Sequence, residues 1–321
     1  MNYAFCGKSG LQLPKISLGL WHNFGYIDNF EEAKNMILYA FEHGVTHIDI
    51  ANNYGPPPGS AESNFGKILK ENLASHRDEM IISSKAGYLM WDGPYGDGGS
   101  RKYLMASLDQ SLKRTGLEYF DIFYSHRYDS NTPVEETMQA LIDMVKQGKA
   151  LYVGLSNYPA DKAREAMTYL NAQHVPSLIY QGKYSMFNRQ PEEEILPVTK
   201  EFGSGFIAFS PLAQGVLTDK YLNGIPEHSR AADTTGFLRK EQVTEELVGK
   251  VRKLNEIARQ REQTMAEMAV AWSLRDERVT SVIVGTRNVT QLQENLNSLK
   301  NLSFTQEELM LIDNILDGAT L

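Results

Sequence analysis

Short apolar runs alternate along the chain with longer stretches in which apolar residues recur every three or four positions. The short runs have the composition of strands, and the longer stretches have the spacing of helices with one apolar face. The predicted strands are 16–20, 45–50, 79–84, 119–124, 150–156, 177–181, 205–210 and 280–285. The predicted helices are 30–43, 60–74, 101–115, Pro133 to Lys146, 160–173, 191–202, 240–261, 264–275, 289–300 and 305–317. This alternation is typical of an α/β protein with a parallel sheet.

Eight strands interleaved with helices predict a (β/α)8 TIM barrel. Residues 3–14 predict an N-terminal β-hairpin that turns between Gly7 and Gly10, and extra helices are expected toward the C-terminal end. A doubly wound open sheet is the rival fold, but it usually carries a G-x-G-x-x-G turn, which does not occur here. Segment 211–239 has no clear period. Since no linker divides the chain, residues 1–321 are expected to form a single domain.

Composition and charge exclude several classes of protein. The chain has 32 Lys and Arg against 40 Asp and Glu, a net charge of −8, which argues against nucleic acid as a partner. No apolar run approaches the roughly 18 residues of a membrane span, and the first ten residues lack the apolar core of a signal peptide. A single cysteine, Cys6, cannot form an intrachain disulfide. We therefore expect a cytoplasmic protein, with no membrane span and no metal site.

Four polar residues stand at the ends of successive predicted strands. Asp49 and Tyr54 follow one strand, Lys85 ends the next, and His126 ends the third. In a barrel these strand ends meet on one face, where active sites form. Each residue alone has a structural interpretation: a turn residue, a loop-packing ring, a solvated charge or a buried hydrogen-bonding imidazole. Together they predict a site that donates a proton.

The chemistry of such a site follows from the residue types. Free tyrosine has a pKa of about 10, and a nearby ammonium stabilises the phenolate. We expect Lys85 to lower the pKa of Tyr54 in this way, and Asp49 to keep Lys85 protonated and oriented. Tyr54 is then the general acid. His126 would orient a carbonyl oxygen, as oxyanion donors do.

Six motifs, in order, resemble those of the aldo-keto reductase family: THIDIANNYG, IISSKAGY, DIFYSHR, GLSNY, QGKYSMFNR and FSPLAQGVLTDKY. The phrase from KAGY to DIFYSHR resembles the bacterial L-glyceraldehyde 3-phosphate reductase-like branch, which is similar to the potassium-channel β subunits. The resemblance implies an NADPH-dependent carbonyl reductase acting on small aldehydes, such as glyceraldehyde 3-phosphate and methylglyoxal-like dicarbonyls. It also implies a homo-oligomer, a tetramer or an octamer.

The resemblance further implies which residues hold the NADPH. Ser156, Asn157 and Gln181 would bind the nicotinamide carboxamide, and Phe209 would stack on the ring unless it is simply an inward barrel residue. The pyrophosphate would lie along Ser210, Leu212, Gly215, Leu217 and Lys220. Arg230 is a second candidate cation for it, with a solvated loop charge as the alternative. The adenosine end would be held by Gly285, Thr286, Arg287, Gln291, Glu294 and Asn295.

One position departs from the family pattern. Many members have an arginine that grips the 2′-phosphate where this chain has Gln291. Arg287 is adjacent and could substitute for it. Gly285 and Thr286 are expected to open the last helix of the barrel, where backbone amides can meet a phosphate.

Four residues are expected to form the substrate-binding end of the site. Trp21 would line the mouth, Tyr88 and Trp91 a second wall, and Arg127 would meet a substrate phosphate or carboxylate. Segment 91–101 would be a mobile lid or an oligomer contact. Two other functions stay open: a nicotinamide-binding regulatory subunit that docks on a channel or another partner, and a barrel lyase or isomerase that uses Lys85 as a Schiff-base amine.

Overall fold

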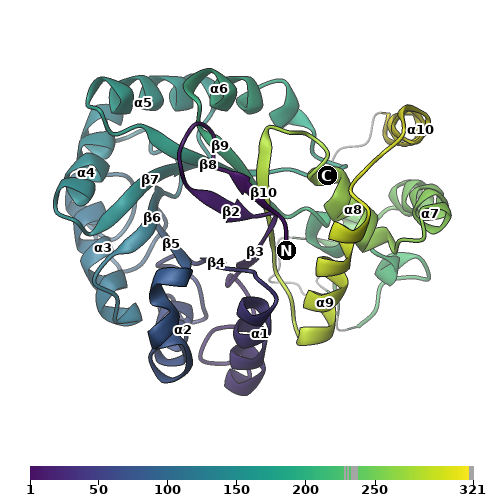
Figure 1. Cartoon of the computed structure of the whole chain (residues 1–321), viewed down its shortest axis with the longest axis horizontal. Helices are drawn as coiled ribbons and strands as arrows, with labels where there is room; N and C mark the ends of the chain where they lie inside the picture. Colours follow the sequence, from purple (N-terminus) through teal and green to yellow (C-terminus); the bar gives the residue numbers. More distant parts are fainter. Residues whose placement is uncertain (228, 230, 233–237, 318–321) are drawn as a thin grey trace.

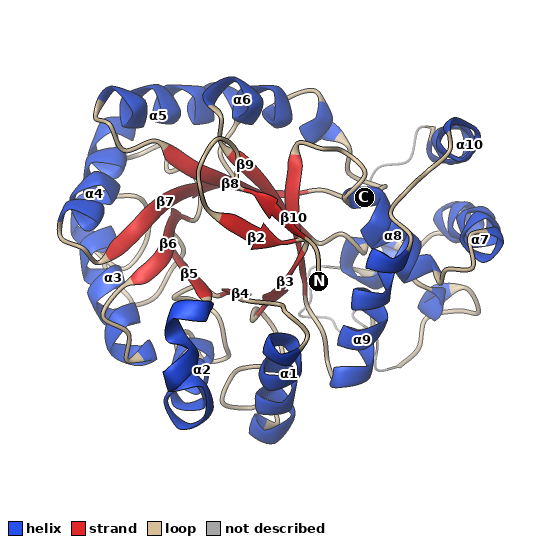
Figure 2. Ribbon diagram, viewed as in Figure 1, coloured by secondary structure: helices blue, strands red, loops and turns tan. Residues whose placement is uncertain are grey.

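The computed structural model describes residues 1–227, 229, 231–232 and 238–317. Its centre is a closed barrel of parallel strands in the order β10-β3-β4-β5-β6-β7-β8-β9 (Figures 1 and 2). The strands are β3 (Ile16–Gly19), β4 (His47–Asp49), β5 (Ile81–Ala86), β6 (Phe120–Ser125), β7 (Ala150–Ser156), β8 (Ser177–Lys183), β9 (Gly205–Phe209) and β10 (Val279–Val284). The prediction of a (β/α)8 barrel is confirmed.

Helices surround the barrel on its outer side (Figure 2). They are α1 (Phe30–Glu42), α2 (Ser60–Ile68), α3 (Arg101–Thr115), α4 (Val134–Lys146), α5 (Ala160–Ala172), α6 (Ile195–Phe202), α7 (Glu245–Gln260), α8 (Met265–Ser273), α9 (Val289–Asn297) and α10 (Gln306–Leu316). The two that exceed the regular set, α7 and α10, lie beside each other at the edge of the molecule (Figure 1). They are joined where the buried Arg261, just after α7, pairs with Glu308 of α10 at 2.8 Å.

Local capping chemistry explains most helix boundaries. Helix α3 matches its predicted bounds because Ser100 caps its first turn and Gly116 ends it in the left-handed conformation. The predicted helix 240–261 was wrong at its start. The hydroxyl of Thr244 accepts from the Leu247 amide, so α7 begins at Glu245 and Lys240–Gln242 forms a separate short turn. The predicted helix 60–74 also changes character, because α2 passes at Leu69 into one wider π-type turn.

An N-terminal hairpin closes the floor of the barrel, at the amino ends of the strands. It consists of β1 (Tyr3–Phe5) and β2 (Gln12–Pro14), as predicted. Cys6, which directly follows β1 in the hairpin, is fully buried, with Sγ 3.4 Å from the carbonyl oxygen of Leu178 at the start of β8. Burial raises the pKa of the Cys6 thiol to about 12. The opposite end of the barrel is thereby left as the open one.

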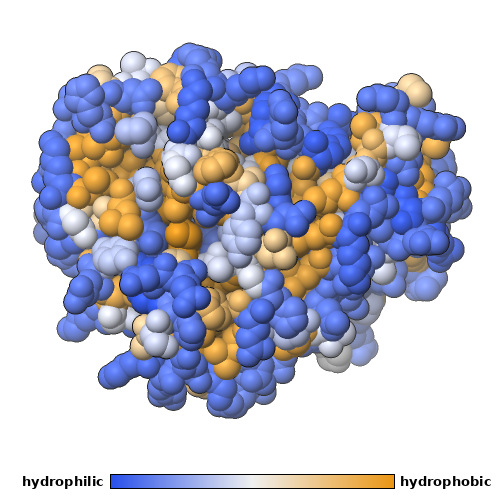
Figure 3. Space-filling model, viewed as in Figure 1, coloured by the Kyte–Doolittle hydropathy of each residue, from blue (hydrophilic) through white to orange (hydrophobic). Residues whose placement is uncertain are grey.

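Figure 3 shows the surface in the same view, in which the hairpin lies in front of the barrel in Figure 1. Hydrophilic residues cover the outer rim formed by the helices, and apolar residues show between the helices. No helix in the described part of the chain is long and apolar enough to cross a membrane.

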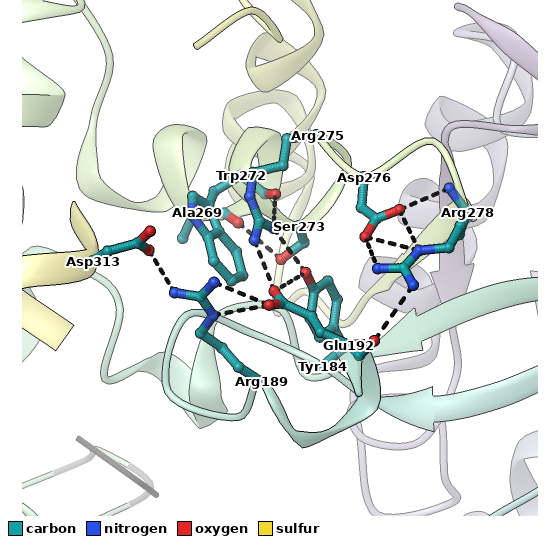
Figure 4. Close-up of polar contacts among 10 residues, drawn as sticks. All are labelled: Tyr184, Arg189, Glu192, Ala269, Trp272, Ser273, Arg275, Asp276, Arg278 and Asp313. Atoms are coloured by element: carbon teal, nitrogen blue, oxygen red, sulfur yellow. Dashed lines mark hydrogen bonds and ion pairs between the residues drawn. The ribbon is translucent and has the colours of Figure 1, made fainter. Parts of the chain in front are cut away.

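An aromatic and ionic cluster fastens the later part of the chain together (Figure 4). The guanidinium carbons of Arg189 and Arg275 lie 5.3 and 3.5 Å from the ring centroid of the buried Trp272. Both arginines pair with Glu192, at 2.9 and 2.7 Å, and Arg189 also pairs with Asp313 of α10. The segment after β8 is thus tied to α8 and to the outer helix α10.

Candidate active site

A cavity of about 1020 Å³ opens at the carboxyl ends of the barrel strands. Its walls come from the segments that follow β3, β4, β5, β6, β7, β8, β9 and β10, together with the α7–α8 corner and α9. The floor of the cavity carries Asp49, Tyr54 and His126, three of the four residues predicted to form a proton-donating site. The fourth, Lys85, is fully buried directly behind them.

Lys85 joins the acid and the phenol. Its Nζ donates to Asp49 Oδ2 at 2.7 Å and to the carbonyl oxygen of Ile50 at 2.6 Å, and it lies 3.3 Å from Tyr54 Oη. The alternation of side chains along β5 turns Ser83 and Lys85 into the barrel, while Ser84 turns outward to Glu62. Strand pairing therefore brings Lys85 against Asp49 of the neighbouring strand β4.

The Asp49 carboxylate is held on both oxygens. Oδ2 accepts from Lys85, while Oδ1 accepts from Ser83 Oγ at 2.7 Å and from Gln181 Nε2 at 3.0 Å. The carboxylate is buried, so these donors replace the water it would otherwise bind. Its orientation, and with it that of the Lys85 ammonium, is fixed.

Burial dominates the pKa shifts of Tyr54 on the cavity floor and of Lys85 behind it. The pKa of Tyr54 is raised well above its usual value, first by burial, then by the charge of Asp49 and the neighbouring Tyr88 phenol. The expected lowering by Lys85 is wrong, because desolvation outweighs that single nearby cation. Burial also lowers the pKa of Lys85, and Asp49 opposes this shift. Tyr54 therefore keeps its proton at neutral pH and can give it only to a strongly basic oxygen formed beside it.

His126 is a neutral imidazole at the cavity floor. Burial, then the charges of Lys85 and Arg127, hold its pKa well below the usual value. Its ring lies edge-on to Tyr54 and to Tyr88, with centroids 6.0 and 4.7 Å apart. Its Nδ1 has no hydrogen-bond partner among the described residues. A neutral ring carries one N–H, which can donate to an oxygen bound in the cavity.

Most residues expected to hold a cofactor line this one cavity. They are Asn157, Gln181, Phe209, Ser210, Leu212, Gly215, Lys220, Gly285, Thr286, Arg287, Gln291, Glu294 and Asn295. Ser156 and Leu217 are buried and do not line it, although Ser156 Oγ accepts from the Asn157 amide at 3.1 Å. Arg230 lies outside the described residues.

Strained backbone marks the wall after β9. Ser210, Ala213 and Gln214 have φ angles of 57°, 46° and 60°, a left-handed conformation that side chains disfavour, and Gly215 follows at 94°. Such outliers persist where the surrounding structure imposes them and are common at ligand sites. Successive left-handed turns also point backbone amides into a concavity that suits anions. This stretch coincides with the positions expected to meet a pyrophosphate.

The adenosine end differs from expectation in one detail. Gly285 and Thr286 do not open the helix, because α9 begins at Val289 behind the cap Asn288, whose oxygen accepts from the Gln291 amide. Residues 285–287 form a loop in front of it. The side-chain oxygen of Gln291 in turn accepts from the Arg287 backbone amide at 3.1 Å, so the two residues considered for the 2′-phosphate are linked.

The four residues expected at the substrate end separate into two pairs. Trp21 and Tyr88 line the cavity, and the Trp21 ring lies 6.5 Å from that of Tyr54. Trp91 and Arg127 do not line it. Trp91 packs against Tyr103 at 5.3 Å. Arg127 donates to the carbonyl oxygen of Gly87 at 2.6 Å and pairs with Asp97 at 2.8 Å, so it braces the 91–101 loop.

Several cavity residues were missed from the sequence. They include Asn53, Lys183, Gln214, Asn255, Arg259, Gln263 and Met265. Lys183 follows Gln181 by two positions on β8, so the side-chain period of a strand could have placed it on the same face. Asn255 and Arg259 lie on α7, and no strand-end signal marks a helix that reaches the cavity from outside the barrel.

Comparison with known proteins agrees with this geometry. Residues 15–317 match the model of the Aldo/keto reductase family. The chain is 55% identical to L-glyceraldehyde 3-phosphate reductase from Escherichia coli O157:H7 and 54% identical to that of Escherichia coli strain K12, over 99% of this chain and 93% of each relative. It is 36% identical to a "Probable voltage-gated potassium channel subunit beta" from Arabidopsis thaliana, over 93% of this chain and 91% of that protein. The predicted resemblance is confirmed.

Proposed function

The chain belongs to the aldo/keto reductase family, and from that membership we propose that it reduces small aldehydes with NADPH, with Tyr54 as the proton donor. The observation that carries the proposal is the arrangement of Tyr54, Lys85 and Asp49. A phenol that keeps its proton faces the cavity, a buried ammonium lies 3.3 Å behind its oxygen, and a carboxylate holds that ammonium in place.

The proton step uses groups already in position. NADPH, when bound, supplies a hydride to the carbonyl carbon. The carbonyl oxygen gains negative charge and takes the proton of Tyr54, and the phenolate left behind is stabilised by the Lys85 ammonium. A neutral His126 can donate its ring N–H to the same oxygen and hold it near Tyr54. Solvent entering through the cavity returns a proton to Tyr54.

The cavity has the size and the chemistry for a dinucleotide. Its volume of about 1020 Å³ is at the upper end of small-ligand sites, which are commonly about 300–1,000 Å³. It extends from Tyr54 past the strained turn at Gly215 to Asn295, and it is lined by amide side chains and cations. Two arginines line the cavity, Arg287 just before α9 and Arg259 on α7, and a guanidinium is suited to the 2′-phosphate that distinguishes NADPH from NADH.

The substrate class rests on the relatives. Two bacterial proteins more than half identical to this chain are named for L-glyceraldehyde 3-phosphate. A short phosphorylated aldehyde needs a cation near the cavity floor. Lys183, two residues beyond Gln181 on β8, lines the cavity and can provide it. Methylglyoxal-like dicarbonyls carry no phosphate, so they could bind at the cavity floor without contacting the Lys183 ammonium.

The test follows the loss of NADPH absorbance in the near ultraviolet. Glyceraldehyde 3-phosphate or methylglyoxal is added to wild-type protein and to Tyr54→Phe, with NADPH and then with NADH. NADPH-dependent decay that Tyr54→Phe nearly abolishes supports both the reaction and the proton donor. Equal decay in the two proteins contradicts the role of Tyr54.

The relatives named as channel β subunits favour a second candidate, a nicotinamide-binding regulatory subunit. Tight NADPH binding with no reduction of any aldehyde would favour it over the reductase. Trapping of Lys85 by borohydride in the presence of substrate would instead indicate Schiff-base chemistry.

A further inference from the structure

A continuous column of buried polar side chains runs through the barrel beneath the active site. Ser281 Oγ lies 2.8 Å from Ser17 Oγ, and Ser17 Oγ lies 2.9 Å from His47 Nδ1. On its other side, His47 Nε2 lies 3.1 Å from Ser83 Oγ, which donates to Asp49 Oδ1 at 2.7 Å. His47 and the three serines have no exposed surface. The column comes from four neighbouring strands, β10, β3, β4 and β5.

The direction of every hydrogen bond in the column follows from counting protons. An ionised carboxylate can only accept, so the single hydroxyl proton of Ser83 is directed at Asp49. Ser83 must therefore accept from His47, and the His47 proton is on Nε2. Burial holds the pKa of His47 at about 4, so the ring is neutral and its Nδ1 can only accept. Ser17 then donates to Nδ1.

Counting protons also gives the direction of the remaining hydrogen bond, between Ser281 and Ser17. Because the proton of Ser17 is directed at His47, Ser17 can only accept from Ser281. All four donors thus point toward Asp49. Hydrogen bonds aligned in one direction polarise one another, so each strengthens the next in the low-dielectric interior. The column ends at the oxygen of Asp49 that is not bonded to Lys85.

We propose that His47, held as its Nε2–H tautomer, is a positioning residue that acts through Ser83 to fix Asp49, and through Asp49 the Lys85 ammonium behind Tyr54. This inference rests on the proposed function for its effect on the reaction. The hydrogen-bond polarity rests on the structure alone. His47 does not line the cavity, so it does not take part in the chemical step.

Ser83 and Ser84 provide a matched pair of variants. They are adjacent on β5, both fully buried, and each donates to a carboxylate, Ser83 to Asp49 at 2.7 Å and Ser84 to Glu62 at 2.6 Å. They point to opposite faces of the strand. Ser83→Ala and Ser84→Ala therefore remove the same kind of bond, inside and outside the barrel.

His47 itself is tested with two amides. Glutamine can place an N–H near the position of Nε2 and keep the bond to Ser83. Asparagine reaches only as far as Nδ1 and cannot. The variants His47→Gln and His47→Asn hence differ in the one contact that the proposal requires.

Two measurements decide the proposal. In nitrogen-15 NMR of the wild-type protein, with His47 assigned from its absence in His47→Gln, the signals should show a protonated Nε2 and a bare Nδ1. In steady-state assays, Ser83→Ala should lower kcat about 10- to 100-fold, as expected for loss of one hydrogen bond to a charged group. His47→Asn removes a hydrogen bond between neutral groups and should lower kcat about tenfold. Ser84→Ala and His47→Gln should stay within about threefold of wild type by the same reasoning, and KM should change little in all four.

Each other outcome has a definite meaning. A proton on Nδ1 overturns the polarity of the column. Equal kcat values for the folded Ser83→Ala and Ser84→Ala proteins overturn the positioning role and leave His47 as a packing residue. A wild-type protein that reduces no aldehyde refutes the proposed function instead, and the NMR spectrum still decides the column.

Discussion

Gln181 donates a hydrogen bond from Nε2 to Oδ1 of Asp49 at 3.0 Å, across 132 positions of sequence. The carboxylate can only accept, so this contact identifies the amide nitrogen of Gln181 and turns its carbonyl oxygen to the other side. Gln181 also lines the cavity. One side chain therefore links the proposed nicotinamide site to the carboxylate that holds Lys85.

Replacing Gln181 by leucine should affect binding and catalysis together. The variant loses the acceptor proposed for the carboxamide and one donor to the buried Asp49. Hydrogen bonds to charged groups are worth about 1.5–3 kcal/mol, so we expect NADPH affinity and kcat each to fall about tenfold or more. Fluorescence titration and steady-state assays measure the two effects. A loss confined to one of them would show that Gln181 does not link the two sites.

Replacing Lys85 by methionine should lower both the stability and the activity of the protein. The change leaves Asp49 buried without its cation, which typically costs about 3–5 kcal/mol of unfolding free energy. It also removes the charge behind Tyr54, and we expect a loss of kcat of about 10²–10⁴-fold. Urea unfolding and assays measure both.

The double variant Asp49→Asn/Lys85→Met is the control for this prediction. It should recover much of the stability, because no isolated charge remains buried, yet stay inactive. Recovery of activity in the double variant would argue against Lys85 as the group that supports Tyr54.

Acid should destabilise the protein through its two buried neutral histidines. The pKa of His47 is about 4 in the folded protein against 6.5 ordinarily, and that of His126 is also well below 6.5. Between these values the unfolded chain binds protons that the folded protein does not. Stability is thus complete above pH 6.5 and is lost as the pH falls toward 4. For His47 this amounts to roughly 3 kcal/mol.

Urea unfolding across that pH range checks the sign and the assignment. The free energy of unfolding of His47→Gln should fall less steeply with acid than that of wild type. The exposed His174 offers a matched control, since His174→Gln should keep the wild-type slope. Parallel curves for wild type and His47→Gln would contradict the assignment.

Cofactor preference should depend on a cation of α7. Arg259 lines the cavity, whereas Lys253 on the same helix is exposed and does not. Removing one phosphate contact, worth about 1–2 kcal/mol in a partly exposed site, should raise KM for NADPH roughly tenfold in Arg259→Ala, with little change for NADH. Lys253→Ala should behave as wild type. An equal change for both cofactors would place Arg259 away from the 2′-phosphate.

The substrate phosphate should be recognised by Lys183 rather than by Arg127. Arg127 is engaged by Gly87 and Asp97 outside the cavity, and Lys183 lines it. Lys183→Ala should raise KM for glyceraldehyde 3-phosphate about tenfold more than for methylglyoxal, the effect of one charge-assisted contact. Arg127→Ala should change both KM values to a similar extent. The reverse ranking would restore the original expectation for Arg127.

The sequence carried enough information for the barrel and for the residues around its mouth. Short apolar runs located the strands, and the 3.6-residue period located most helices. Because strand ends in a barrel meet on one face, Asp49, Lys85 and His126 could be placed together from the sequence. The start of α7 was also within reach, because Thr244 is a favoured N-cap residue and is followed by two acidic residues, Glu245 and Glu246, at the head of an amphipathic stretch.

Other features depend on contacts that no local pattern encodes. The direction of the Tyr54 pKa shift depends on how completely the barrel excludes water. The position of Arg127 depends on Asp97, 30 residues away in a loop without periodicity. His47 lies inside an apolar run, and the sequence marks it only as part of a strand. Its role could not be predicted, because its hydrogen-bond partners Ser17 and Ser83 come from neighbouring strands.

The buried thiol of the hairpin makes this protein a ready host for site-specific labels. Cys6 is the chain's single cysteine, and with no exposed surface and a pKa of about 12 it should resist thiol-reactive dyes. Cysteines introduced at the exposed Tyr95 and on the hairpin turn at Lys8 would then be the reactive pair. Energy transfer between dyes on those two positions would report directly whether the 91–101 segment moves when NADPH enters the barrel.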